Sequence, residues 1–317
     1  MTVESVARLK THVRTELAKV VVGQHETLDQ LLLTVLCGGH ALVEGVPGMA
    51  KTLAVKTLAQ LFRLEFQRVQ STPDLMPADV LGGNVWNAAS GAFMLHKGPI
   101  FTDLLLVDEI NRTPPRTQSA LLEAMEERQV TIDGTRHPLS QYFTVFATQN
   151  PIEFEGTYPL PEAQLDRFLV KIRVDYPSAE EEAAILDRYQ GGFDPRHLER
   201  ANLSPADTEL LAAARTEVAR VRVEPALFRY ITEIARRTRE WPAVSLGASP
   251  RAAVYLMLVA KAVAATDGRD YLIPDDVKEA APTVLRHRLV LRPEADLEGI
   301  TSDQVVSEVL AAIAVPK

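Results

Sequence analysis

The residues best suited to chemistry in this chain form a short loop that could bind a nucleoside triphosphate. Residues 45–52 read Gly-Val-Pro-Gly-Met-Ala-Lys-Thr, close to the phosphate-loop pattern G-x-x-x-x-G-K-[ST]. Lys51 would supply a cation for the outer phosphates, and Thr52 a hydroxyl for magnesium. Ala50 stands where the pattern has its second glycine. Because alanine adds only a Cβ, we expect an otherwise helical backbone to tolerate it there.

A pair of acids follows a second apolar segment. Residues 104–107 are Leu-Leu-Leu-Val, and Asp108 and Glu109 come directly after them. In many nucleotide hydrolases such a strand end supplies both a metal ligand and a base. Asp108 would hold magnesium, mostly through water, and Glu109 would orient and activate the attacking water. The alternative is a strand that ends in solvated acids, but the position about 55 residues after the phosphate loop favours hydrolysis.

Two further polar residues lie at the ends of expected strands. The apolar segment that starts at residue 143 finishes in Asn150, which could reach a γ-phosphate or the attacking water. The alternative for Asn150 is a turn residue before Pro151. Arg167 begins the apolar strand expected over residues 168–174 and could act as an arginine finger on the ATP of a neighbouring subunit. Its alternative is a surface ion pair with Asp166.

A third arginine, Arg251, opens a helix expected over residues 252–265. Ser249 is a good N-cap and Pro250 suits the first helical position. Arg251 then lies in the first turn, where the helix dipole favours an acid. A cation in that position invites an anionic partner, for which a γ-phosphate is one choice. A solvated helix start is the alternative.

The elements that must position these residues alternate between strand and helix. Helical spacing of apolar residues predicts helices near residues 6–17, 26–37 and after Lys51. Apolar segments predict short strands over residues 40–44, 66–69, 104–107, 143–147 and 168–174. This alternation predicts an α/β fold with a parallel sheet and helices on both faces. Two inserted hairpins are expected, near residues 84–101 and over 129–140, the second around an Asp133-Gly134 turn.

The character of the chain changes between residues 177 and 200. Beyond this point the sequence reads as helices separated by proline and glycine. We therefore expect a nucleotide-binding core over residues 1–190 and a smaller, all-helical lid domain over residues 191–317.

Composition limits the classes of function. The chain has 317 residues, 46% of them apolar, with 34 basic and 42 acidic residues and a formal charge of −8. This balance argues against a general nucleic-acid-binding surface. The lone cysteine, Cys37, is expected to be a buried small hydrophobe, and no secretory signal is visible. No apolar run approaches the roughly 18 residues needed to span a bilayer, so we expect a cytoplasmic protein.

In this order, the segments resemble the AAA+ ATPases and, among them, the MoxR family. The resemblance covers essentially the whole chain and is most specific in Asp-Glu-Ile-Asn-Arg and Gln-Asn-Pro. It is less specific in the helical C-terminal third. Alanine at position 50 also fits this family. The segments that carry the resemblance are residues 45–52, 108–112, 118–130, 147–151, 161–168 and 249–251.

The resemblance implies a role for each candidate residue. Lys51 and Thr52 would be Walker A residues, Asp108 and Glu109 Walker B, Asn150 sensor 1, Arg167 the arginine finger and Arg251 sensor 2. The catalytic set would be Glu109, Asn150, Arg167 and Arg251, with Thr52 and Asp108 at Mg²⁺. ATP would contact Val22, Gly23, Gly45, Val46, Pro47, Gly48, Met49, Ala50, Lys51, Thr52 and Leu53.

The resemblance also implies an assembly and a task. It implies a ring, most commonly a hexamer, that binds ATP at subunit interfaces and remodels a client protein in the manner of a chaperone. A partner with a von Willebrand factor A domain often accompanies such proteins. One alternative is a DNA-linked AAA+ machine, either helicase-like or a transcription activator. Another is a nucleotide-switch scaffold without catalysis, which would require a defective catalytic glutamate, whereas Glu109 is present.

Overall fold

The computed structural model describes residues 3–46, 48–151 and 156–316. Its centre is a five-stranded sheet in the order β2-β5-β8-β1-β9, and every neighbouring pair of strands is parallel. The predicted parallel sheet is confirmed. The strands are β1 (Ala41–Gly45), β2 (Phe66–Gln70), β5 (Leu104–Asp108), β8 (Thr144–Gln149) and β9 (Val170–Val174).

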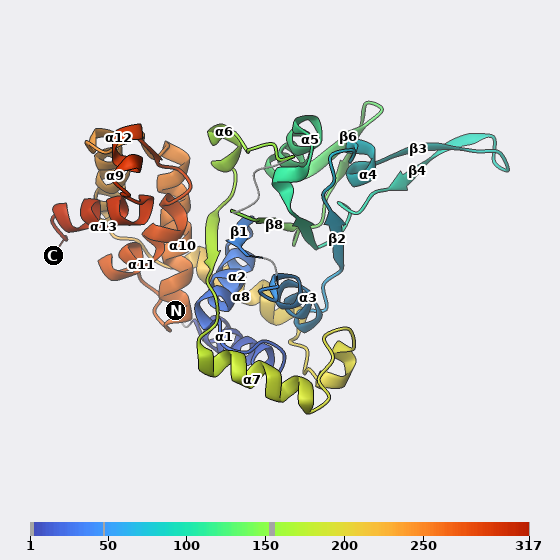
Figure 1. Ribbon diagram of the computed structural model, residues 1–317, viewed down its shortest axis with the longest axis horizontal. Coiled ribbons are helices and arrows are strands. Elements are labelled where there is room, and N and C mark those ends of the chain that lie inside the picture. The colour runs from blue at the N-terminus through green and yellow to red at the C-terminus, as the bar shows by residue number, and fades with distance from the viewer. Residues whose placement is uncertain (1–2, 47, 152–155, 317) are drawn as a thin grey trace.

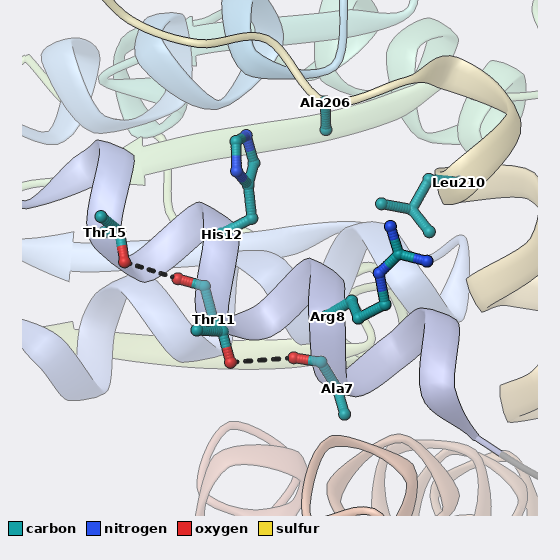
Figure 2. Close-up of a pocket in the computed structure, with 7 residues that line it drawn as sticks. All are labelled: Ala7, Arg8, Thr11, His12, Thr15, Ala206 and Leu210. Atoms are coloured by element: carbon teal, nitrogen blue, oxygen red, sulfur yellow. Dashed lines mark hydrogen bonds between the residues drawn. The ribbon is translucent and has the colours of Figure 1, made fainter.

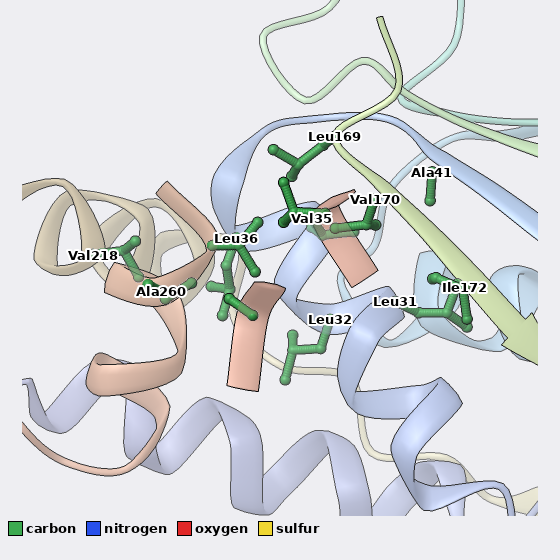
Figure 3. Close-up of a cluster of buried hydrophobic side chains, with 14 of the residues drawn as sticks. Leu31, Leu32, Val35, Leu36, Ala41, Leu169, Val170, Ile172, Val218 and Ala260 are labelled. Carbon is green, nitrogen blue, oxygen red and sulfur yellow. The ribbon is translucent and has the colours of Figure 1, made fainter. Parts of the chain in front are cut away.

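Alternating residues of each strand point to opposite faces of this sheet. Leu104 and Leu106 join one apolar cluster, whereas Leu105 and Val107 join another. The first face is covered by helices α1 (Glu4–Leu17), α2 (His25–Cys37) and α3 (Lys51–Leu61), and the second by α4 (Pro77–Leu81) and α5 (Pro115–Glu127). Figure 3 shows leucines of α2 beside Val170 and Ile172 of β9. Helices therefore cover both faces, as predicted.

Two antiparallel hairpins extend from the second face. One joins β3 (Gly82–Asn87) to β4 (Ala92–Lys97), and the other joins β6 (Gln129–Ile132) to β7 (Thr135–Pro138). The β3–β4 hairpin reaches away from the body of the molecule (Figure 1). Asp133 and Gly134 both have positive φ, which suits a two-residue hairpin turn. Asn84 Nδ2 donates to Asp133 Oδ2 at 2.7 Å and so links the two hairpins.

The C-terminal part is mainly helical, and its helices α9 to α13 lie together at the left of Figure 1, where α10 packs against α2 and α11 against β9. It also contains a short antiparallel pair of strands, β10 (Val244–Leu246) and β11 (Val290–Leu291), which corrects the expectation of helices alone. The pair forms because the loop before α10 runs beside the segment after α11, where Arg292 N donates to Ala243 O. Helices α6 (Glu162–Leu165) and α7 (Ala179–Gln190) precede this part, on either side of β9. The helices that follow are α8 (Thr208–Arg220), α9 (Pro225–Glu240), α10 (Pro250–Thr266), α11 (Pro274–Leu285), α12 (Pro293–Leu297) and α13 (Ser302–Ala312).

Helix α8 packs against α1 and α2, although it follows residue 190. The division of the chain at that residue stays a prediction. Cys37 is only half-buried rather than buried, and its Sγ donates to Leu258 O at 3.5 Å. In the described residues, none of the helices combines the length and the apolar character that crossing a membrane requires.

Candidate functional site

The carboxyl ends of three adjacent strands converge on one hollow of about 390 Å³. The order β5-β8-β1 places the ends that carry Asp108, Asn150 and the phosphate loop side by side. This edge of a parallel sheet is where ligands bind in open α/β folds. The residues around the hollow are Gly48, Met49, Ala50, Lys51, Thr52, Leu53, Arg68, Gln70, Asp108, Glu109, Thr148, Asn150, Tyr189 and Pro195.

The phosphate loop follows β1 and leads into α3. Gly45 is required by close packing, since a Cβ there would lie 2.7 Å from the carbonyl oxygen of Val174. Gly48 has a φ of +86°, which favours glycine. Lys51 Nζ donates to the carbonyl of Gly45 at 2.5 Å, so the ammonium folds back over the loop. Pro47, which belongs to the expected nucleotide contacts, lies outside the described residues.

Ala50 has a left-handed backbone, with φ +53° and ψ 18°. The backbone at Ala50 is therefore not the helical one for which we expected alanine to be tolerated. A left-handed conformation costs a residue with a Cβ roughly 1–2 kcal/mol. Ala50 occupies the N-cap position of α3, and its carbonyl accepts the first helical bond from Ala54 N at 2.9 Å. The loop therefore holds Ala50 in a conformation that glycine would adopt more easily.

The two acids at the end of β5, Asp108 and Glu109, have different surroundings. Asp108 is buried and accepts hydrogen bonds from Arg68 Nε at 2.6 Å and from Thr148 Oγ1 at 3.1 Å. Glu109 has a left-handed φ of +56°, and its backbone N–H donates to Thr148 Oγ1 at 2.9 Å. Glu109 therefore adopts a left-handed backbone directly after the strand ends. Non-glycine residues in this region often mark functional sites.

The side chain of Glu109 is held at the rim of the hollow. Gln70 Nε2 lies 3.4 Å from Glu109 Oε2, and the Arg112 guanidinium lies 3.4 Å from the same oxygen. Burial lowers the pKa of Lys51 below its usual value, while the carboxylates of Asp108 and Glu109 act in the opposite direction. The site therefore combines a partly desolvated cation, which attracts phosphate oxygens, with two acids, which suit a bound polyphosphate only together with a metal ion.

The side chains around the hollow suit a magnesium ion that is bound mainly by the phosphates of the substrate. Within the described ranges, no group of three or more His, Cys, Asp or Glu side chains could hold a metal. Mg²⁺ commonly uses one or two protein ligands together with phosphates and waters. Thr52 and Asp108 line the same hollow and provide a hydroxyl and a carboxylate for this purpose.

A second, smaller hollow of about 120 Å³ adjoins the phosphate loop and shares Gly48 to Ala50 and Leu53 with the first. Val22 contributes to its wall, and Gly23 is packed so closely against the Glu181 side chain that a Cβ would clash. An apolar slot beside a phosphate site suits the flat ring of a base. Its apolar side chains include Val20, Val21, Val22, Leu53, Ile185 and Phe193.

Arg167 and Arg251 lie elsewhere and do not line either hollow. Arg167 was expected to begin a strand, but β9 starts at Val170, and Arg167 lies in the turn after α6. The turn continues because Arg167 N and Phe168 N donate to the carbonyls of Gln164 and Leu165. Both arginines pair with Glu126 at the end of α5. Within one chain, neither arginine belongs to the lining of the hollow at the phosphate loop.

Sequence reasoning missed several residues of the site. Arg68 and Gln70 reach the hollow because β2 runs parallel to β5, with Gln70 opposite Asp108. Thr148 points to the acids from β8, and Tyr189 closes the hollow from the end of α7. The sequence did contain a signal for these residues, because Arg68 and Gln70 are polar residues near the carboxyl end of an expected parallel strand. That signal identifies the site only when the order of the strands in the sheet is known, and the order comes from the fold.

A further surface hollow of about 620 Å³ lies between α1 and the start of α8 (Figure 2). Three of its polar side chains bond to backbone carbonyls: Thr11 to Ala7, Thr15 to Thr11 and His12 to Ser204. Beyond these residues, the hollow offers the Arg8 side chain and apolar contact with residues such as Leu210.

Comparison with known proteins shows the family. A model described as "ATPase family associated with various cellular activities (AAA)" matches residues 40–170, and a model of the AAA lid domain matches residues 236–309. The chain is 44% identical to Chaperone MoxR1 of Mycobacterium tuberculosis, over 95% of this chain and 81% of that protein. This chain belongs to the MoxR family of AAA+ ATPases.

Two further relatives cover nearly the whole length of this MoxR-family chain. YeaC of Bacillus subtilis is 47% identical over 94% of this chain and 92% of that protein. A crystal structure of a candidate ATPase from Cytophaga hutchinsonii superimposes with a TM-score of 0.89 at 41% identity, covering 99% and 98% of the two chains. The predicted family and fold are confirmed. The roles of individual residues stay predictions.

Proposed function

We propose that this MoxR-family chain hydrolyses ATP at the hollow formed by the ends of β1, β5 and β8. The observation that carries the proposal is the convergence of Lys51, Thr52, Asp108, Glu109 and Asn150 on that one hollow. The apolar slot beside Val22 would hold the adenine, and the loop over residues 45–53 would hold the phosphates. When bound, Mg²⁺ at Thr52 and Asp108 would neutralise charge on the outer phosphates.

In the proposed reaction, Glu109 accepts a proton from the attacking water. The water oxygen bonds to the γ-phosphorus, and the bond from that phosphorus to the β–γ bridging oxygen breaks, leaving ADP and phosphate. Asn150, buried at the end of β8, would orient the γ-phosphate or the water. Gln70 and Arg112, both 3.4 Å from Glu109 Oε2, would hold the base at the rim of the site.

The proposed site is completed by a second subunit. Because neither Arg167 nor Arg251 lines the hollow at the phosphate loop of its own chain, we infer that both act on the ATP of a neighbour. Planar guanidinium groups suit this role, since they stabilise charge that spreads over the transferring phosphoryl group. A closed ring, which we take to be a hexamer, would place every pair of arginines beside a neighbouring nucleotide.

We further propose that hydrolysis in the cytoplasm drives the remodelling of a client protein, as the name of the Mycobacterium tuberculosis relative suggests for that protein. A partner with a von Willebrand factor A domain would select the client. A DNA-linked role has less support, because the β6–β7 hairpin offers only Arg136 and His137 as basic residues and also carries Asp133.

The test is the specific ATPase rate as a function of protein concentration, with the oligomeric state measured in parallel by native mass spectrometry. We expect the rate per chain to rise as rings assemble, since a monomer lacks the arginines of a neighbour. A rate per chain that is the same in monomers and rings would overturn the shared site. A rate no higher than that of a Lys51→Ala variant in every state would overturn the ATPase proposal itself.

A further inference from the structure

Glu126 bridges the two arginines that the proposed function directs at a neighbour's nucleotide. Its Oε2 lies 3.1 Å from Arg167 Nε, and its Oε1 accepts from an outer nitrogen of Arg251. The three side chains come from different elements: the end of α5, the turn after α6 and the first turn of α10. One carboxylate thus joins two cations that are 84 positions apart in sequence.

The backbone segments beneath these arginines are already fixed to each other. Asp166, next to Arg167, accepts hydrogen bonds from the hydroxyl of Ser249 at 2.9 and 3.0 Å. Arg288 Nε donates to the same carboxylate at 2.8 Å. Ser249 precedes Arg251 by two residues, so one carboxylate anchors both segments. These contacts hold the backbone of the two segments, but they do not fix the direction of the Arg167 and Arg251 side chains.

Glu126 supplies that direction. Two guanidinium groups directed at one point repel each other, and a carboxylate between them offsets that repulsion. The side chains remain accessible, with exposed fractions of 30% for Arg167, 37% for Arg251 and 36% for Glu126. Each guanidinium has five N–H donors, so bonding to Glu126 leaves others for a second anion. Arg167 and Arg251 are therefore two adjacent cations that can still donate to phosphate oxygens.

We propose that Glu126 is a positioning residue that aligns Arg167 and Arg251 for the γ-phosphate on the adjoining subunit. This inference rests on the proposed function of the two arginines. Glu126 contacts neither substrate nor the reacting atoms, and it acts on the neighbour's reaction rather than on its own chain's. Its loss therefore produces a defect in kcat that appears in trans, with ATP binding by the same chain left intact.

The test measures ATPase kinetics of assembled Glu126→Ala, with Glu127→Ala as the matched control. Glu127 is the next residue of α5 and is exposed. We expect Glu126→Ala to lower kcat by about tenfold or more with KM for ATP nearly unchanged, because small misplacements of positioning groups carry costs of this size. Glu126→Gln, which keeps one acceptor but loses the charge, should fall between Glu126→Ala and wild type. Glu127→Ala should match wild type.

A second measurement separates positioning in trans from a local structural effect. Glu126→Ala chains are mixed with Lys51→Ala chains, which keep intact arginines and an intact Glu126. Rescue above the sum of the separate activities is expected, because some interfaces then join a functional phosphate loop to correctly held arginines. A kcat for Glu126→Ala within twofold of wild type, a higher kcat, or a loss without rescue in co-assembled rings would overturn the proposal.

Two control variants distinguish this failure from failure of the proposed function. If Arg167→Ala and Arg251→Ala lower kcat and are rescued in the same mixing experiment, the shared site stands whatever Glu126 does. If neither variant is rescued, the proposal of a shared site is wrong, and the proposed role of Glu126 is then wrong as well.

Discussion

Arg288 forms an ion pair with Asp166 in which Nε lies 2.8 Å from Oδ1, and the arginine side chain is only 1% exposed. The same guanidinium donates to the carbonyls of Asp166 and Leu169 and lies 5.1 Å from the centre of the Tyr255 ring. Arg288 follows α11, whereas Asp166 precedes Arg167 in the turn after α6. The pair therefore joins the C-terminal helices to the turn that carries Arg167.

Replacing Asp166 with alanine should lower the free energy of unfolding by about 3 kcal/mol, since it leaves a buried guanidinium without its counter-ion. Chemical denaturation at constant protein concentration measures this change. Arg288→Met in the Asp166→Ala background should recover part of the loss, because the unpaired buried charge is then gone. A single Asp166→Ala variant as stable as wild type would show that the pair adds nothing to the fold.

Glu109→Gln should leave ATP binding nearly unchanged while hydrolysis falls by roughly 10²–10⁴-fold, the usual contribution of a general base. The amide keeps the size of the side chain but cannot accept the proton. Steady-state turnover and equilibrium nucleotide binding are measured on the same preparation, with Glu123→Gln on the exposed side of α5 as the control. Unchanged turnover would exclude Glu109 as the base.

His40 should make stability depend on pH. Burial lowers its pKa to about 3. Val145 N donates to Nδ1 at 2.9 Å, and Nε2 lies 3.1 Å from Met125 O, so the neutral ring satisfies both contacts. Between the unfolded pKa of about 6.5 and the folded pKa, only the unfolded chain binds this proton. The contribution of neutral His40 to the free energy of unfolding is therefore present in full above pH 6.5, and it is lost as the pH falls toward 3.

The expected contribution of His40 to this slope is about 1.4 kcal/mol per pH unit. Denaturation of the wild type and of His40→Gln from pH 7.5 to pH 4.5 measures it. The variant should be less stable at neutral pH, because a buried contact changes, but its stability should depend less steeply on pH. Equal slopes for the two proteins would show that His40 is protonated equally in the folded and unfolded states.

The sequence was sufficient to predict the parallel sheet, because apolar segments and helical spacing are local signals. It also identified the polar residues at the strand ends. It could not predict that Ala50 is left-handed, since its φ depends on how the loop closes over Lys51. Nor could it place Arg251 beside Arg167, because that depends on how α10 packs against the turn after α6. The role of Glu126 could not be predicted either, because nothing in the sequence around an acid on an exposed helix face indicates its two arginine partners.

The central claim is that each nucleotide site is shared between two subunits, and mixing two inactive variants tests it most directly. Arg167→Ala keeps an intact phosphate loop, and Lys51→Ala keeps intact arginines. After co-assembly is shown by native mass spectrometry, ATPase activity is measured across mixing ratios. The shared site predicts activity in the mixtures well above the sum of the separate proteins, with a maximum at intermediate ratios. Activity that stays at that sum at every ratio would contradict it.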